Sequence, residues 1–152
     1  MSASPGLGTR LRRLLADLDG AVQAEYDRRG AAFRPKYHPV VRRLLARPAE
    51  STGALAASAG VSQPAMTQTL REMTRAGLVA VAPGPDRREH LARLTPAGRT
   101  LAAELAPLWA AIEAAARQLE DEAGPLGQVL DAATEALRRQ PFSARIDREF
   151  NR

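Results

Sequence analysis

The sequence predicts a mainly α-helical protein with one short β-hairpin, an α+β fold in which helices dominate. Apolar side chains recur at three- and four-residue steps over most of the 152 residues, as they do on the buried face of a helix. This period changes to strand-like alternation only between residues 78 and 95. A content of 45% hydrophobic and 26% charged residues is typical of a globular chain with a substantial core.

The composition also excludes several classes of protein. The chain has no cysteine, which excludes a disulfide framework, a thiol redox switch and a cysteine zinc site. No apolar run approaches the roughly 18 residues of a membrane span, and no signal peptide precedes the first helix. We therefore expect a cytoplasmic protein without a membrane partner.

Two helices are predicted in the N-terminal part of the chain. Residues 7–29 carry apolar side chains at helical spacing opposite a charged face, which predicts a long amphipathic helix. A connection with Pro35 and Pro39 follows, because proline does not fit a helix interior. A second helix is predicted at residues 40–46, and its side chains expected in the core are Val40, Val41, Leu44 and Leu45.

The stretch STGALAASAGVSQPAMTQTLREMTRAG predicts two short helices joined by a tight turn. Ser51 or Thr52 can cap the first helix, and Gly60 can end it in the left-handed conformation. Ser62 can cap the second helix, with Pro64 tolerated in its first turn. This is the pattern of a helix-turn-helix, although an ordinary helical hairpin is the alternative because alanine and glycine are abundant throughout the chain.

The second helix of this pair has distinct apolar and polar faces. Met66, Leu70 and Met73 fall on one stripe and are expected in the core. Such a helix can lie in the major groove of DNA with its N-terminal residues against the base edges. The side chains on its other faces that can bind bases or phosphates are Gln63, Thr67, Gln68, Arg71 and Arg75.

A β-hairpin is predicted directly after the second helix. Residues 78–82 and 90–95 read as strands, and PGPD between them is dense in turn-forming residues. Such a hairpin forms the wing of a winged helix-turn-helix. Arg87 and Arg88 at its tip can reach the minor groove of DNA. Asp86 can either pair with the Arg88 side chain or form an Asx turn.

The distribution of charge agrees with a nucleic-acid partner for the first part of the chain. Residues 1–95 hold 15 Lys and Arg against 8 Asp and Glu, a net charge of +7. Residues 96–152 hold 7 against 9, a net charge of −2. The basic part contains the helix-turn-helix, so we expect it to bind a polyanion and the remainder to serve another purpose.

Two further helices are predicted after the hairpin. The first is capped by Thr95 and runs from Pro96 to about residue 120, and the second spans residues 126–139. Their apolar stripes, and that of the N-terminal helix, lack enough surface in their own chain to cover them. A second copy can supply it, which predicts a two-fold homodimer, with a monomeric bundle as the alternative. The role of residues 141–152 is left open.

Several short motifs give the chain a family resemblance. They are the G-L-V of Gly77, Leu78 and Val79, the D-x-R of Asp86 and Arg88, and the L-T-x-x-G of Leu94, Thr95 and Gly98. Together with the helix-turn-helix they resemble the MarR family of bacterial transcriptional regulators over roughly residues 40–100. The resemblance implies a homodimeric winged helix that binds a pseudo-palindromic operator, usually as a repressor, and often releases DNA when a small ligand binds.

The resemblance also assigns residues. By position, Gln63, Pro64, Thr67 and Gln68 match the segment used for major-groove contacts, and Arg88 matches the wing arginine. Many members carry Ser and Arg where this chain has Pro64 and Gln68, which leaves the operator sequence open. We expect recognition helices about 34 Å apart in the dimer, one turn of B-DNA. The residues expected at the DNA are Ser62, Gln63, Pro64, Thr67, Gln68, Arg71, Arg75, Asp86, Arg87 and Arg88.

We therefore expect three parts: an N-terminal dimerisation helix at residues 1–35, a winged helix-turn-helix DNA-binding domain at 36–98, and C-terminal dimerisation helices at 99–152. The terminal helices would form a dimerisation bundle. A small-molecule effector held between the bundle and the DNA-binding part would alter the separation of the wings. Candidates for lining such a pocket are Tyr37, His38 and Trp109, with core packing as the alternative.

No pattern of reactive residues predicts catalysis, a metal site or a cofactor. His38 and His90 are the only histidines, and neither has a second ligand at metal spacing. No serine has a histidine and a carboxylate at a recognisable spacing, so nucleophilic catalysis has no support. Two other classes stay open: a winged-helix protein-interaction module without its own operator, and a small enzyme acting on a bound ligand.

Overall fold

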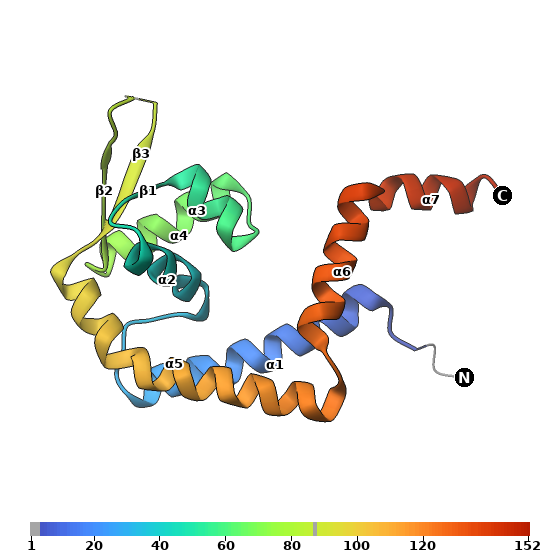
Figure 1. The fold of residues 1–152 in the computed structure, drawn as a ribbon, viewed down its shortest axis with the longest axis horizontal. Helices are drawn as coiled ribbons and strands as arrows, with labels where there is room; N and C mark the ends of the chain where they lie inside the picture. Colours follow the sequence, from blue (N-terminus) through green and yellow to red (C-terminus); the bar gives the residue numbers. More distant parts are fainter. Residues whose placement is uncertain (1–3, 87) are drawn as a thin grey trace. The chain divides into compact units, whose positions relative to one another are not determined.

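A computed structural model describes residues 4–86 and 88–152 (Figure 1). The chain forms two compact units, one ending at Ala106 and the other running from Pro107 to Arg152. The three-part division at residues 35 and 98 stays a prediction. Within the described ranges, none of the helices combines the length and apolar character that a membrane span needs.

The helices of the first unit follow the predicted order. The helix expected at residues 40–46 begins two residues earlier, because a 3-10 turn leads directly into it and Pro39 falls in its first turn, where a missing N–H is tolerated. The elements are α1 (Leu7–Arg28), the 3-10 helix η1 (Pro35–Tyr37), α2 (His38–Ala46), α3 (Thr52–Ala59), α4 (Gln63–Arg75) and the start of α5 (Pro96–Ala123).

The core of the first unit lies where α2, α3, α4 and the hairpin meet. From α2 it takes Val40, Val41 and Leu44, but Leu45 is 49% exposed, so the prediction that Leu45 is in the core is wrong. Leu45 lies at the margin of the apolar stripe, one position beyond Leu44 around the helix. The other large side chains of this core are Leu55, Met66, Leu70, Met73, Leu78, Val79 and Leu94.

The helices of the helix-turn-helix begin and end at the predicted capping residues. The Ser51 hydroxyl accepts a hydrogen bond from the Ala54 N–H at 3.1 Å, which settles Ser51 over Thr52 as the cap of α3. Gly60 ends α3 with φ +67°, a left-handed conformation that a side chain would strain. Ser62 caps α4 by accepting from the Ala65 N–H at 3.3 Å.

The predicted hairpin is present, and it belongs to a three-stranded antiparallel sheet. Strands β2 (Val79–Pro83) and β3 (His90–Leu94) form the hairpin, which projects from the helices of this unit (Figure 1). A third strand, β1 (Glu50–Ser51), pairs with β3 on its other side, giving the order β1-β3-β2. Strand β1 was not predicted, because two residues are too short to show alternation.

Glu50, in strand β1, is buried although glutamate is usually exposed. Its ion pairs hold β1 in place. Its side chain is only 8% exposed and forms ion pairs with Arg43 at 3.2 Å and Arg47 at 3.4 Å. Both arginines come from α2 or its C-terminal end. A buried carboxylate requires such partners, since isolating it from water is costly. The pairs therefore fix the start of the helix-turn-helix to α2.

The residues of the G-L-V and L-T-x-x-G motifs interlock at the base of the hairpin. The Thr95 hydroxyl donates to the Gly77 carbonyl at 2.5 Å and accepts from the Gly98 N–H at 2.9 Å. The Thr95 N–H also donates to the Leu78 carbonyl at 3.1 Å. One threonine thus caps α5 and ties its start to the end of α4, across the whole hairpin.

Gly98 permits this approach because it has no side chain. A Cβ atom placed there would lie 2.1 Å from the Leu78 carbonyl oxygen, a distance that backbone atoms can relieve only by moving apart. We expect Gly98→Ala to lower the free energy of unfolding by roughly 1–3 kcal/mol, measured by urea denaturation. Gly20→Ala is the matched control, since a Cβ there meets nothing within 4 Å.

The control should leave stability unchanged or raise it by about 0.5–1 kcal/mol, because alanine is preferred to glycine inside a helix. Equal urea midpoints for the two variants would show that the approach of α5 to Leu78 does not stabilise the fold.

The second unit contains the rest of α5, then α6 (Leu126–Arg139) and α7 (Phe142–Phe150). The helix expected to end near residue 120 continues to Ala123, and α6 has the predicted bounds. The final segment, whose role was left open, is helical. Arg145 anchors it to the end of α6 by donating to the carbonyls of Ala136 at 3.0 Å and Gln140 at 3.2 Å.

Candidate nucleic-acid interface

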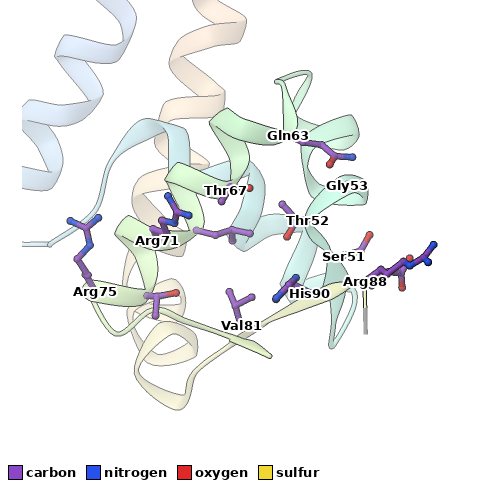
Figure 2. A pocket seen from close by; sticks show the side chains of 13 residues that line it. Ser51, Thr52, Gly53, Gln63, Thr67, Arg71, Arg75, Val81, Arg88 and His90 are labelled. Atoms are coloured by element: carbon purple, nitrogen blue, oxygen red, sulfur yellow. The ribbon is translucent and has the colours of Figure 1, made fainter. Parts of the chain in front are cut away.

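A groove of about 800 Å³ lies between α4 and the hairpin, closed at one side by the start of α3 (Figure 2). It belongs entirely to the first unit. Most of its lining residues are polar or charged, and Leu70 and Val81 are apolar. The lining residues are Ser51, Thr52, Gly53, Gln63, Thr67, Leu70, Arg71, Thr74, Arg75, Val81, Arg88, Glu89 and His90.

Five of the predicted DNA-binding residues meet in this groove. Gln63, Thr67, Arg71 and Arg75 follow one another at four-residue steps, so they share one face of α4. The helix can present them because Met66, Leu70 and Met73 anchor the adjoining stripe of the helix in the core, with Leu70 also lining the groove. Arg88 comes from the hairpin, which the Thr95 interlock places beside α4.

The other predicted residues lie elsewhere. Ser62 caps α4, and Pro64 and Gln68 are exposed on α4 but do not line the groove. Asp86 accepts a hydrogen bond from the Arg88 backbone N–H at 3.0 Å, which is the turn-forming interpretation of the two considered. Arg87 lies outside the described residues.

Several groove residues were not predicted. Thr74 continues the α4 face that begins at Gln63, so helical spacing contained this signal. His90 and Glu89 are brought in by the hairpin register, which pairs His90 with Pro83. Ser51 and Thr52 enter because the start of α3 meets the N-terminal end of α4, a proximity that no local pattern indicates.

Gln63 rests against the backbone of α3. A Cβ at Gly53 would lie 3.1 Å from the Gln63 Nε2 atom, so Gly53 makes the space that this amide occupies. The end of a long side chain can move by that much at little cost. Gly53 therefore influences the direction in which the Gln63 side chain points. It has little effect on the stability of the helix pair.

The groove is positively charged. Three guanidinium groups, those of Arg71, Arg75 and Arg88, stand against the single carboxylate of Glu89 among its lining residues. All three arginines are exposed, so they can be approached by a ligand. A concave basic surface of this kind focuses positive potential and so attracts a polyanion such as a phosphate backbone.

A second polar cluster lies on the neighbouring flank of α4, around Glu72. Lys36 Nζ lies 2.6 Å from the Glu72 Oε2 atom, and the Tyr37 hydroxyl donates to the same oxygen at 3.2 Å. Gln68 Nε2 donates to the Oε1 atom of Glu72 at 3.3 Å. Both carboxylate oxygens are therefore engaged, and α4 is tied to η1. Glu72 was not among the predicted site residues.

These contacts change two pKa values in opposite directions. The hydrogen bond from Lys36 is the largest cause and lowers the pKa of the Glu72 carboxyl. Desolvation by burial opposes it, and the bond from Gln68 lowers the pKa further. Burial raises the pKa of the Tyr37 hydroxyl above 10.0, and its bond to the Glu72 carboxylate raises it further. Lowering pH therefore removes a favourable interaction at Glu72.

The sign of this effect gives a test. Because the folded pKa of Glu72 is lowered, its contribution to the free energy of unfolding is complete above the unfolded value near 4.5 and is lost as pH falls through the folded value. We expect Glu72→Gln to flatten the fall in stability on acidification below about pH 5, measured by urea denaturation at a series of pH values.

Glu104→Gln, at an exposed position of α5, is the matched control and should keep the wild-type acid dependence. If both variants lose stability on acidification as the wild type does, Glu72 is not an acid-sensitive contact.

The three residues predicted to contact an effector are divided between the two units. Tyr37 is buried and donates to Glu72, and His38 begins α2 in the same unit. Trp109 belongs to the second unit and is half-buried. None of the three lines the groove, so the effector pocket stays a prediction. Among the described residues, no group of three or more His, Cys, Asp or Glu side chains could hold a metal ion.

A capped helix pair, an exposed polar face on its second helix and a β-hairpin beside that face define a winged helix-turn-helix protein. No protein-family model matches the sequence, and no curated protein gives a significant match. Solved structures do. The transcriptional regulator MOSR from M. tuberculosis, in complex with DNA, is similar with a TM-score of 0.67 and 24% identity, covering 85% of this chain and 98% of that chain.

Two further solved structures extend this likeness. A MarR family transcriptional regulator from Silicibacter pomeroyi DSS-3 has a TM-score of 0.64 and 26% identity, covering 86% of this chain and 94% of that chain. Bordetella bronchiseptica BpsR has a TM-score of 0.67 and 23% identity, covering 93% and 97%. The protein has the fold of the MarR family of transcriptional regulators, which confirms the resemblance that its sequence motifs indicated.

Proposed function

We propose that the protein is a transcriptional regulator that binds double-stranded DNA as a homodimer, with α4 in the major groove and the hairpin over the minor groove. The observation that supports this most directly is the groove itself, which gathers Gln63, Thr67 and Arg71 of α4 with Arg88 of the hairpin. Similar proteins support it as well, since MOSR and the repressor CouR were both solved with DNA. No catalytic role is proposed.

Each side chain has a role that its chemistry favours. The amides of Gln63 and Gln68 and the hydroxyl of Thr67 can hydrogen-bond base edges, because they lie in the N-terminal half of α4. Arg71 and Arg75 can bind phosphates farther along the helix, and Arg88 can anchor the hairpin. Phosphate contacts then fix the register, and the polar side chains read the sequence.

The homodimer accounts for apolar side chains that the single chain leaves in water. On α1, Leu7, Leu11 and Leu15 are 72%, 42% and 58% exposed, and on α6 Val129 is 61% exposed. Apolar faces of this extent mark interaction surfaces. A two-fold dimer through the terminal helices would cover them and would match a pseudo-palindromic operator, with recognition helices about 34 Å apart.

Regulation by a small molecule completes the proposal. The similar protein BpsR has its DNA binding regulated by 6-hydroxynicotinic acid, and NadR was solved in complex with 4-hydroxyphenylacetate. We propose by analogy that this protein acts as a cytoplasmic repressor that an effector releases from its operator. Tyr37, His38 and Trp109 are the residues proposed to contact that effector.

Arg88 provides the sharpest test of DNA binding. We expect Arg88→Ala to weaken operator binding by roughly 1–3 kcal/mol and to reduce the slope of log affinity against log salt by about 1, because one phosphate contact is lost. Fluorescence anisotropy over a salt series measures both quantities. The operator itself is obtained by sequencing genomic DNA fragments that the purified protein retains.

The control for this experiment is Arg13→Ala, which removes an exposed arginine of α1 that does not line the groove. It should keep the wild-type affinity and salt slope. If Arg88→Ala behaves like Arg13→Ala, the Arg88 side chain does not take part in binding. If the wild type ignores duplex DNA even at low salt, the proposed function is wrong.

The dimer has a test of its own. We expect Leu15→Glu to shift the protein from dimer to monomer in sedimentation velocity, since a carboxylate would be buried in the proposed interface without a partner. Arg13→Glu places the same group on the opposite, polar face of α1 and should leave the dimer intact. A monomeric wild-type protein would contradict the dimer outright.

A further inference from the structure

Glu72 occupies an unexpected place for a carboxylate, on the helix proposed to enter DNA and one turn beyond Gln68. Its side chain is 21% exposed, and both of its oxygens accept hydrogen bonds or pair with a cation. The bond from Gln68 Nε2 to Glu72 Oε1 is 3.3 Å long. Gln68 itself is exposed, so the rest of its amide is available to a ligand.

The chemistry of this bond fixes the orientation of the Gln68 amide. A glutamine amide has an acceptor end and a donor end, and without a partner it can turn either end outward. An ionised carboxylate only accepts, so Gln68 must turn its NH₂ group toward Glu72. The carbonyl oxygen then faces away from Glu72, and one of the two N–H donors remains unused by this bond.

This orientation corresponds to a particular base. Glutamine recognises adenine in the major groove by accepting from the N6 amino group through its oxygen while donating to N7 through its NH₂ group. An amide held with its oxygen outward and one donor left over offers that pair of groups. A freely turning amide would also accommodate other bases, since it could present donors alone.

Glu72 is itself held in place from η1. The Tyr37 hydroxyl bonds it, and the Tyr37 side chain is 4% exposed and packs edge-on against Phe33 with ring centroids 5.6 Å apart. Phe33 packs in turn on Tyr26 at the end of α1, at 5.0 Å. Lys36 supplies the opposite charge at 2.6 Å, which offsets the repulsion that a carboxylate on this helix would exert on phosphates.

From these contacts we infer that Glu72 is a positioning residue for specificity: it holds the Gln68 amide so that the protein prefers adenine at the base pair that Gln68 reads. Glu72 makes no contact with DNA in this scheme and acts only through Gln68. The inference rests on the proposed function. It adds two points: the base that Gln68 selects, and the residue that orients the Gln68 amide.

The test is a selection from random duplex DNA, carried out on the full-length wild type, Gln68→Ala and Glu72→Met. We expect the wild type to enrich adenine at one position of each half-site, on the order of tenfold as for a paired amide contact. Gln68→Ala should lose enrichment at that position alone. Glu72→Met should lose most of it at the same position while every other position keeps its preference.

Glu72→Met leaves the buried Tyr37 hydroxyl without its acceptor and could therefore misfold. A second variant controls for this. Glu72→Gln keeps an acceptor for Tyr37, but its own amide can turn and so no longer dictates the orientation of Gln68. It should fold as the wild type does, checked by circular dichroism, and should weaken the adenine preference several-fold. Lys36→Gln is the matched control, since it removes the cation and leaves the Gln68 bond intact.

The outcomes separate two failures. If the wild type selects no DNA sequence, the proposed function fails. If the wild type selects a site and Gln68→Ala alters one position, but both Glu72 variants keep the wild-type preference there, the inference about Glu72 is overturned. Enrichment of a base other than adenine at the Gln68 position overturns it too. A loss of selectivity spread evenly over all positions assigns Glu72 a purely structural role and likewise overturns it.

Discussion

The hydroxyl of Thr95 connects the parts of the winged helix on which everything else depends. It links the end of α4, through the Gly77 carbonyl, to the start of α5, through the Gly98 N–H. The hairpin lies between these two points in the chain, so closing them fixes where the hairpin leaves the helices. Gly98 makes the closure possible, because any side chain would collide with the Leu78 carbonyl. The groove exists because this connection places the hairpin beside α4.

Helix α4 contributes to three surfaces at once. Its apolar stripe of Met66, Leu70 and Met73 is buried, which fixes the rotation of the helix about its own axis. That rotation turns the face that begins at Gln63 toward the hairpin and leaves Gln68 and Glu72 on the flank toward η1. One flank is basic and open, whereas the other is a network of hydrogen bonds and charges. The proposed reading of DNA therefore combines a phosphate-binding groove with a side chain of fixed orientation.

Most of the local structure followed from the sequence. Ser51, Gly60 and Ser62 gave the ends of the helix pair, because capping depends on residues one to three positions away. The hairpin was predictable for the same reason, from its alternation and its turn residues. The strand at Glu50 was not, and neither was the exposure of Leu45, because each depends on how α2 meets its neighbours. Of the residues predicted at the DNA, Arg71, Arg75 and Arg88 line one groove, a meeting that was not predicted, and Asp86 shapes the turn.

The sequence by itself determined most of the helical segments, the ends that capping residues set, and most of the polar and apolar faces, since these properties arise from interactions between residues close together in the chain. Only the tertiary structure decided that Lys36 and Tyr37 meet Glu72, and that Ser51 and His90 join α4 in one groove. These contacts join residues far apart in the chain. Their physical cause is the burial of a shared core, which orients each helix as a whole and so sets partners that no local pattern encodes.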